Sequence, residues 1–191
     1  MIIEKRRETK ETKIRVGLNI DGSGKAEIAT GVGFFDHMLE SLAKHAGFDL
    51  TVRCEGDTHI DDHHSVEDVG IVLGEAFRDA VYPIEGVERF GNSVVVMDEA
   101  AVECALDLSN RPYLVYEIDV DGKVGHFDAE LAEEFFKAFA FNAGITLHLV
   151  QQRGKNRHHI IEAAFKACAV ALRRALAPNA KAGIPSTKGI L

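Results

Sequence analysis

Cysteine is scarce in this chain, with three residues among 191. Cys54, Cys104 and Cys168 are odd in number, widely separated and without the CxxC spacing of a structural zinc site, so we expect buried thiols in a reducing compartment rather than disulfides. Long apolar runs are also missing, since none approaches the roughly 18 residues of a membrane-spanning helix. The first residues have neither the apolar core of a signal peptide nor the character of a transit peptide, which predicts a soluble, cytoplasmic protein with no membrane partner.

An excess of positive charge is missing too. The chain carries 22 Lys and Arg against 30 Asp and Glu, a net charge of −8, whereas proteins that bind nucleic acid normally present a basic face. We therefore expect no nucleic-acid partner, and an anionic substrate would need a local cluster of basic side chains. The hydrophobic content of 46% allows a sizeable core, and the length suits one domain or two small fused halves.

The order of predicted elements repeats along the chain. The first half is predicted to contain strands at 13–20 and 25–30 that form a hairpin around a turn at 21–24, a helix at 35–47, a strand at 48–54, a polar loop at 57–62 and a helix at 65–81. After a connector at 83–91, the second half is predicted to contain strands at 93–97, 100–106 and 113–120, a helix at 131–141, a strand at 145–151, a loop at 153–157 and a helix at 158–176.

Local sequence similarity supports a duplicated unit. Ala46-Gly47-Phe48-Asp49-Leu50 aligns with Ala143-Gly144-Ile145-Thr146-Leu147, and each segment leads through a polar loop into a His-His-x-x-Glu helix. We predict an α+β fold in which helices cover one face of each sheet, an internally duplicated sandwich with pseudo-twofold symmetry. The single domain 1–191 would consist of repeats at about 1–90 and 91–180 and a tail at 181–191 that is mobile or dependent on a partner.

The repeated motif reads His63-His64-Ser65-Val66-Glu67 in the first half and His158-His159-Ile160-Ile161-Glu162 in the second. Residues three and four apart share a helix face, so the first His and the Glu of each motif can bind one ion, while the second His points elsewhere. His and carboxylate ligands suit Mn, Fe, Co, Ni or Zn, and the lack of Cys argues against a structural zinc site. A lone His can simply cap or pack at a helix start, but two equivalent triplets in a repeat predict metal binding.

Two further histidines, His37 and His126, each lie near a Phe-Asp pair at the approach to the first helix of their half. They could complete two sites of four protein ligands that leave positions for substrate and water. Because adjacent His side chains point apart, we expect the ligands to be shared between neighbouring subunits, which makes assembly metal-dependent. Asp61, Asp62 and Asp68 could accept hydrogen bonds from the imidazoles. The predicted ligands are His37, His63, His64, Glu67, His126, His158, His159 and Glu162.

Basic residues that could bind an anion form the second candidate set. Lys166 follows Glu162 by four residues, so its ammonium group is expected to project from the same helix face toward whatever the metal holds. The other candidates lie in loops or in the tail, where charge-assisted hydrogen bonds could hold a phosphate, although each alone is typical of a solvated surface charge. They are Arg89, Arg111, Ser186 and Lys188.

Several motifs are distributed over most of the chain: Arg7 to Thr12, Gly33 to Leu39, Asp61 to Gly70, Asn110 to Pro112, Lys155 to Glu162 and Ser186 to Gly189. In these motifs, from its N-terminal segment to its C-terminal Ser-Thr-Lys-Gly, the chain resembles the imidazoleglycerol-phosphate dehydratase family of the L-histidine biosynthetic pathway. The resemblance implies dehydration of imidazole glycerol phosphate to imidazole acetol phosphate, two Mn²⁺ ions per active site, and a 24-subunit homo-oligomer built from trimers. It also implies a duplicated fold related to the second domain of ribosomal protein S5.

Individual roles follow from the same resemblance. Glu11 matches the family's substrate-contacting glutamate and is the expected general base, although beside Lys10 and Lys13 it would otherwise be typical of a surface ion pair. His45 matches another substrate-contacting position, but a His near a helix end can equally interact with the helix dipole. The residues that match substrate or phosphate contacts are Arg89, Arg111, Lys166, Ser186 and Lys188.

The reaction itself explains why metal ions are expected. The proton on C2 has no adjacent carbonyl, so a side-chain base cannot remove it directly. Two ions on the ring nitrogens would convert the imidazole to imidazolate, whose electron density expels the C3 hydroxyl and leaves a diazafulvene-like intermediate. C2 then becomes acidic, so that a carboxylate can take its proton and yield an enol that becomes the ketone.

Two other functions remain open from the residues alone. A two-metal phosphoesterase would also use bridging carboxylates and phosphate-binding arginines, although such sites usually depend on Asp bridges rather than His pairs. A metal-nucleated assembly or storage protein would use the ions to join subunits and leave no open coordination position.

Overall fold

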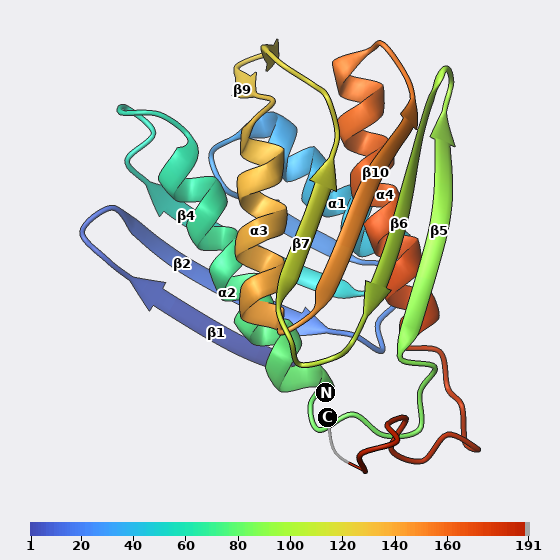
Figure 1. Ribbon diagram of the computed structural model, residues 1–191. Helices are drawn as coiled ribbons and strands as arrows, with labels where there is room; N and C mark the ends of the chain where they lie inside the picture. Colours follow the sequence, from blue (N-terminus) through green and yellow to red (C-terminus); the bar gives the residue numbers. More distant parts are fainter. Residues whose placement is uncertain (190–191) are drawn as a thin grey trace.

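The computed structural model describes residues 1–189 and has two four-stranded sheets and four helices (Figure 1). The first half contains β1 (Ile3–Glu8), β2 (Thr12–Asn19), β3 (Ala26–Ala29), α1 (Gly33–Ala46), β4 (Asp49–Gly56) and α2 (His63–Val81). The second half contains β5 (Phe90–Met97), β6 (Ala100–Asp107), β7 (Tyr113–Glu117), β8 (Lys123–Val124), β9 (Phe127–Asp128), α3 (Leu131–Ala143), β10 (Thr146–Arg153) and α4 (Arg157–Ala175).

The two large sheets share one topology. Their strand orders are β1-β2-β4-β3 and β5-β6-β10-β7, and in each order the first two pairs are antiparallel while the last pair is parallel. In each half, the strand that lies between the two helices in the sequence, β4 or β10, is therefore an inner strand of its sheet. The predicted α+β class is confirmed, and the matching strand order supports the predicted duplication.

The predicted hairpin of strands 13–20 and 25–30 is wrong, because these strands, β2 and β3, do not pair with each other. β4 lies between β2 and β3, pairs antiparallel with β2, and pairs parallel with β3. Alternating hydrophobicity identifies a strand but not its partner, and β4 presents Leu50, Val52 and Cys54 to the core between both neighbours. The hairpin that forms instead joins β1 to β2. β1 was not predicted because every residue after Ile3 is charged, as expected for an edge strand.

The four helices lie between the two sheets (Figure 1). α1 and α2 cover the first sheet, α3 and α4 cover the second, and the layers meet where α2 packs on α3 and α1 packs on α4. In α1, Phe35, Met38, Leu39 and Leu42 are buried at helical spacing. The interior is thus continuous across both halves, and the α1–α4 contact joins the first helix of one half to the last helix of the other.

The three cysteines are free and buried, as predicted. The strand predicted to end at Val120 stops at Glu117, and the small β8–β9 hairpin that follows was not predicted. Within residues 1–189, no helix combines the length and the apolar character needed to cross a membrane.

The tail lies against the connector between the two halves. The Gly86 N–H donates to the Gly183 carbonyl at 2.8 Å, and the Asn179 N–H donates to the Gly86 carbonyl at 2.7 Å. These bonds hold the segment that carries Ser186 and Lys188 next to the first residues of β5. The last two positions of the predicted tail, 190–191, lie outside the described residues.

Candidate metal centre and substrate-binding residues

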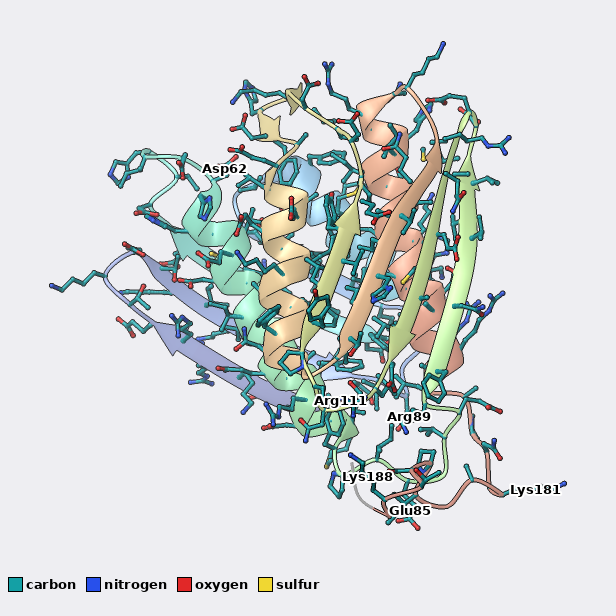
Figure 2. The ribbon with its side chains drawn as sticks, in the orientation of Figure 1. Asp62, Glu85, Arg89, Arg111, Lys181 and Lys188 are labelled. Carbon is teal, nitrogen blue, oxygen red and sulfur yellow. The ribbon has the colours of Figure 1, made fainter. Side chains whose placement is uncertain are left out.

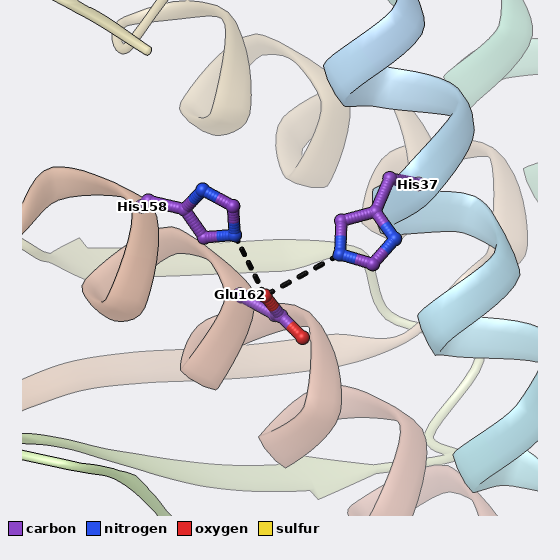
Figure 3. A group of neighbouring side chains, drawn as sticks. All are labelled: His37, His158 and Glu162. Carbon is purple, nitrogen blue, oxygen red and sulfur yellow. Dashed lines mark hydrogen bonds and ion pairs between the residues drawn. The ribbon is translucent and has the colours of Figure 1, made fainter.

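Three of the predicted ligands converge where α1 packs on α4 (Figure 3). The donor atoms of His37, His158 and Glu162 all lie within 4.8 Å of one another. Glu162 Oε2 is 2.9 Å from His158 Nε2 and 3.5 Å from His37 Nε2. Glu162 is only 5% exposed, whereas both imidazoles reach solvent. A cation bound here would meet two ring nitrogens and one carboxylate, a donor set that suits Mn, Fe, Co, Ni or Zn ions.

The second oxygen of Glu162 is held by Lys166. Lys166 Nζ lies 2.7 Å from Glu162 Oε1, so the lysine points to the ligand group as its helical spacing predicted. Burial acts to raise the pKa of Glu162, but hydrogen bonds from Lys166 and His158 outweigh it and leave that pKa lowered. The carboxylate is therefore held in the ionised form that binds metal.

His45 lies on α1 two turns after His37, within range of the charges of Lys166 and Glu162. Burial lowers the pKa of His45, and the positive charges of Lys166 and Arg173 lower it further. The lowered pKa favours the neutral imidazole, in which one nitrogen can accept a hydrogen bond while the other donates.

The corresponding pair in the first motif is looser. His63 Nε2 is 3.6 Å from Glu67 Oε2 on α2, and both side chains are partly exposed. His126 lies between β8 and β9, close enough for its charge to act on the carboxyl of Asp62. Among residues 1–189, His37, His158 and Glu162 form the one set of three or more His, Cys or acidic donors that lie this close together. A single chain therefore brings only part of the predicted second ligand set together.

The second histidine of each motif points away from the first. The rings of His63 and His64 are 6.3 Å apart at 83°, and those of His158 and His159 are 6.2 Å apart at 76°. The predicted divergence of adjacent imidazoles is therefore present in both halves, and the two motifs have nearly the same geometry.

Carboxylates that the motif analysis missed hold these second histidines. His64 Nδ1 is 3.0 Å from Asp57, and His159 Nδ1 is 2.8 Å from Glu99. The hydrogen bond to Asp57 raises the pKa of His64, and the bond to Glu99 raises that of His159. Glu99 in turn has its pKa lowered to about 2, first by His159 and then by two backbone N–H groups. The sequence offered little signal for either residue: Asp57 is one of several acidic residues in the polar loop before the first motif, and Glu99 lies in a predicted turn between two strands, 60 residues before His159.

The aspartates predicted for that role do other things. Asp68 is buried and accepts a hydrogen bond of 2.5 Å from the Thr12 hydroxyl, while Asp61 accepts one from the backbone N–H of His63. Asp62 is the residue before α2 and makes no side-chain capping bond. Asp68 is four residues after His64 and so shares its helix face, but its carboxylate is paired with the Thr12 hydroxyl and with Arg7 Nε, 3.4 Å away, and the role predicted for it was wrong.

The predicted phosphate-binding residues lie at the other end of the molecule (Figure 2). Arg89 contacts Asp107 through Nε at 2.7 Å and donates to the Pro185 carbonyl at 2.7 Å. Arg111 lies 3.5 Å from the same aspartate and is largely exposed. Ser186 and Lys188 follow Pro185 in the tail, so this end gathers all of the predicted phosphate contacts except Lys166.

The length of α4 separates the predicted phosphate contacts from the group formed by His37, His158 and Glu162. The backbone N–H of Arg89 donates to the carbonyl of Ala175, the last residue of α4, while His158 is its second residue. At 1.5 Å per residue, the helix places these points roughly 25 Å apart. A small phosphorylated imidazole cannot span that distance, so one chain does not supply both groups to one molecule of such a substrate.

Glu11 belongs to a third cluster, near His64. Glu11 Oε1 is 3.8 Å from His64 Nε2, and its backbone carbonyl accepts a hydrogen bond from the Asp57 N–H. The β1–β2 turn is thereby joined to the loop that precedes α2. The expected general base is half exposed and lies beside a predicted metal ligand.

Comparisons with known proteins show the family to which the chain is similar. Residues 30–172 match the family model described as imidazoleglycerol-phosphate dehydratase. Proteins of that name from a Nitratiruptor species and a Sulfurovum species are 68% and 67% identical over 190 residues, with full coverage of both chains in each case. Solved structures of the enzyme from Staphylococcus aureus and of the Pyrococcus furiosus enzyme in complex with (S)-C348 each give a TM-score of 0.85. Their identities are 39% and 38%, and they cover 94% and 98% of this chain and 100% of their own.

Proposed function

This chain belongs to the imidazoleglycerol-phosphate dehydratase family of hydro-lyases, and we propose that it dehydrates imidazole glycerol phosphate to imidazole acetol phosphate at metal sites shared between subunits. The distance along α4 is the observation that supports active sites shared between subunits. His158 and Arg89 lie at opposite ends of that helix, so a site that holds both the imidazole and the phosphate needs a second chain. Membership of the family places the reaction in histidine biosynthesis.

The ligand set supports two Mn²⁺ ions per active site. One ion would be held by His37, His158 and Glu162, which already lie within reach of a common centre. The other would be held by His63, Glu67 and His126, with His64 and His159 supplied to neighbouring subunits because they point away from their own groups. When bound, the ions supply Lewis acidity at both nitrogens of the substrate imidazole. The homo-oligomer proposed from the family resemblance is a 24-mer built from trimers.

Glu11, Lys166 and His45 have the remaining roles in proton transfer and substrate orientation. Glu11 is the general base for the C2 proton, and its position is fixed through the bond between its carbonyl and the Asp57 N–H. Lys166, already paired with Glu162, and the neutral imidazole of His45 face the ligand group and can hold the substrate hydroxyls by hydrogen bonds. Both groups thereby orient the C2–C3 bond between the ring and the base.

Phosphate binding belongs to the opposite end of a neighbouring chain. Arg111 is largely exposed and makes longer contacts, 3.5 Å to Asp107 and 3.3 Å to the Ser109 carbonyl, whereas Arg89 is held by Asp107 and the Pro185 carbonyl at 2.7 Å. Arg111, Lys188 and Ser186 would bind the phosphate, and Arg89 would hold the tail in place and contribute charge. Binding the remote phosphate orders the substrate without taking part in the bond changes.

Subunit mixing tests this arrangement. Glu11→Gln and Arg111→Ala should each lose most activity alone, but co-assembly of the two chains should restore a fraction of it, because some sites receive both native residues from different chains. Mixing Arg111→Ala with Lys188→Ala is the matched control and should restore nothing, because both residues come from one end of one chain. Ketone product from imidazole glycerol phosphate is the measurement. No recovery in the first mixture, with mixed assembly shown by mass spectrometry, would place the whole site within one chain.

The same reaction mixture separates the alternatives. Release of inorganic phosphate without ketone product would indicate a phosphoesterase. A Glu11→Gln chain that loses bound metal and assembly together with turnover would indicate a structural role for the ions, whereas the proposed function requires the assembly and the metal to survive this substitution.

A further inference from the structure

The contacts to the second histidines are the same in both halves although they come from unrelated segments. Asp57 follows β4 and precedes the helix that carries His64 by only a short loop. Glu99 lies in the β5–β6 turn, 60 residues from His159 in the chain. Both nevertheless place a carboxylate oxygen against Nδ1, at 3.0 and 2.8 Å. A chance surface pair would not be expected to recur with the same ring nitrogen from two different places in the fold.

Each carboxylate is itself held in place. Glu99 Oε1 accepts the backbone N–H groups of Lys155 and Asn156, at 3.1 and 2.7 Å, so that Oε2 remains for His159. The Asn156 side chain also caps α4 by accepting the His159 N–H. The backbone of Asp57 is fixed by its N–H bond to the Glu11 carbonyl and by the Ile60 N–H that its own carbonyl accepts. The imidazoles therefore meet acceptors that have little freedom to move.

The chemistry of the contact selects one imidazole form. An ionised carboxylate can only accept a hydrogen bond, so the hydrogen of a neutral ring must sit on Nδ1, and the lone pair is then on Nε2. The same bond stops the ring from turning about its Cβ–Cγ axis. In both halves Nε2 lies 3.8 Å from a second carboxylate, from Glu11 in one case and from Asp98 in the other, which is too long for a hydrogen bond and leaves the lone pair of Nε2 able to bind a metal ion.

We propose that Asp57 and Glu99 are positioning residues that hold His64 and His159 in the Nδ1–H tautomer and aim Nε2 at a metal ion centred on a neighbouring subunit. The inference rests on the proposed function, because it takes the second histidines to be ligands. It adds two residues that contact neither substrate nor metal and act only through the rings that they hold.

Amide substitutions test the proposal with little change of shape. In Asp57→Asn and Glu99→Gln the new amide can donate to Nδ1, which permits the opposite tautomer. Two readouts apply to the full chain: the ¹⁵N NMR shifts of the imidazoles in the metal-free protein at a pH above their titration, and the Mn²⁺ affinity from the electron paramagnetic resonance signal of the free ion. Glu55→Gln and Glu117→Gln are matched controls, since both carboxylates are exposed on strands of the same two sheets.

The expected result is specific to each half. Asp57→Asn should move only the His64 resonances toward the Nε2–H form, Glu99→Gln should move only those of His159, and each should weaken Mn²⁺ binding about 10- to 100-fold. The controls should match the native chain, and unchanged circular dichroism would show that the variants fold. Native tautomers and native affinity in both variants would overturn the positioning role while leaving the proposed function intact. A native chain that binds no Mn²⁺ would overturn the proposed function itself, before any variant is compared.

Discussion

Arg89 shows how much of a residue's role depends on its neighbours. Its backbone has a φ of 71°, a conformation that non-glycine residues adopt rarely, and its guanidinium is paired with Asp107 and the tail carbonyl of Pro185. The hydrogen bond to Asp107 raises the pKa of Arg89, so its charge is permanent. A residue selected from the sequence as a phosphate contact thus also holds the segment that carries Ser186 and Lys188.

Asp49 provides a pH-dependent prediction at the same scale. Its carboxylate accepts the N–H groups of Ser23 and Lys25, at 2.8 and 3.0 Å, and these bonds lower the pKa of Asp49. A carboxyl whose pKa is lower in the folded state stabilises the fold above its ordinary pKa of about 4, and the contribution disappears as the pH falls toward the lowered value. In the metal-free chain, Asp49→Asn should therefore lower the urea midpoint at neutral pH, and the difference should shrink at about pH 3.

The control for this measurement is Asp21→Asn, because Asp21 is exposed in the same loop and its N–H, not its carboxyl, makes the local bond. Its urea midpoint should follow the native chain at every pH. A constant difference between Asp49→Asn and the native chain across this range would contradict the assignment.

At the scale of elements, the contact between α2 and α3 depends on glycine. A Cβ built at Gly70 would lie 2.9 Å from the Phe135 carbonyl, and one built at Gly74 would lie 2.7 Å from the Phe139 carbonyl. Backbone atoms of α3 cannot move away as a flexible side chain would. These two positions therefore set how closely the helix that carries His63 and His64 approaches its neighbour in the second half.

Gly74→Ala is expected to lower the free energy of unfolding by about 1–3 kcal/mol, because overpacking outweighs the gain in helix propensity. Urea denaturation at a fixed chain concentration measures the change. Gly33→Ala is the matched control: it lies at the start of α1 with open space around it, and its stability should be equal to or slightly above that of the native chain. Equal stability of both variants would show that α3 yields without cost.

At the scale of the whole molecule, the proposed sharing of His64 and His159 between subunits would make assembly depend on the metal ions. If His64 and His159 serve a neighbour's ions, then chelation removes contacts between subunits as well as ligands. A chelator should convert the native particle to smaller species in light scattering or size-exclusion chromatography, and Mn²⁺ should restore both size and activity.

The Glu11→Gln chain provides the comparison for this experiment. Its chelation should produce the same loss of size, because this substitution removes the base and leaves the ligands in place. A native particle that keeps its size after complete removal of the metal would show that protein contacts alone hold the subunits together, and the shared-ligand arrangement would have to be abandoned.

Much of the candidate site was predictable because it is local. His158 and Glu162, like His63 and Glu67, are four residues apart, and the pitch of a helix brings such pairs together wherever the helix lies. The direction of Lys166 follows from the same pitch. The strand and helix boundaries were close to those observed where hydrophobic periodicity was strong, and failed at β1, where charge hides the strand.

The sequence by itself determined the two His-His-x-x-Glu helices, the α+β class and the divergence of each His pair, because these depend on spacing within single elements. Only the tertiary structure decided that His37 meets Glu162, that Asp57 and Glu99 hold the second imidazoles, and that β4 separates β2 from β3. It also placed Arg89 at the far end of α4 from His158. Such contacts join segments distant along the chain, and their geometry is set by how helices and sheets pack rather than by any local repeat.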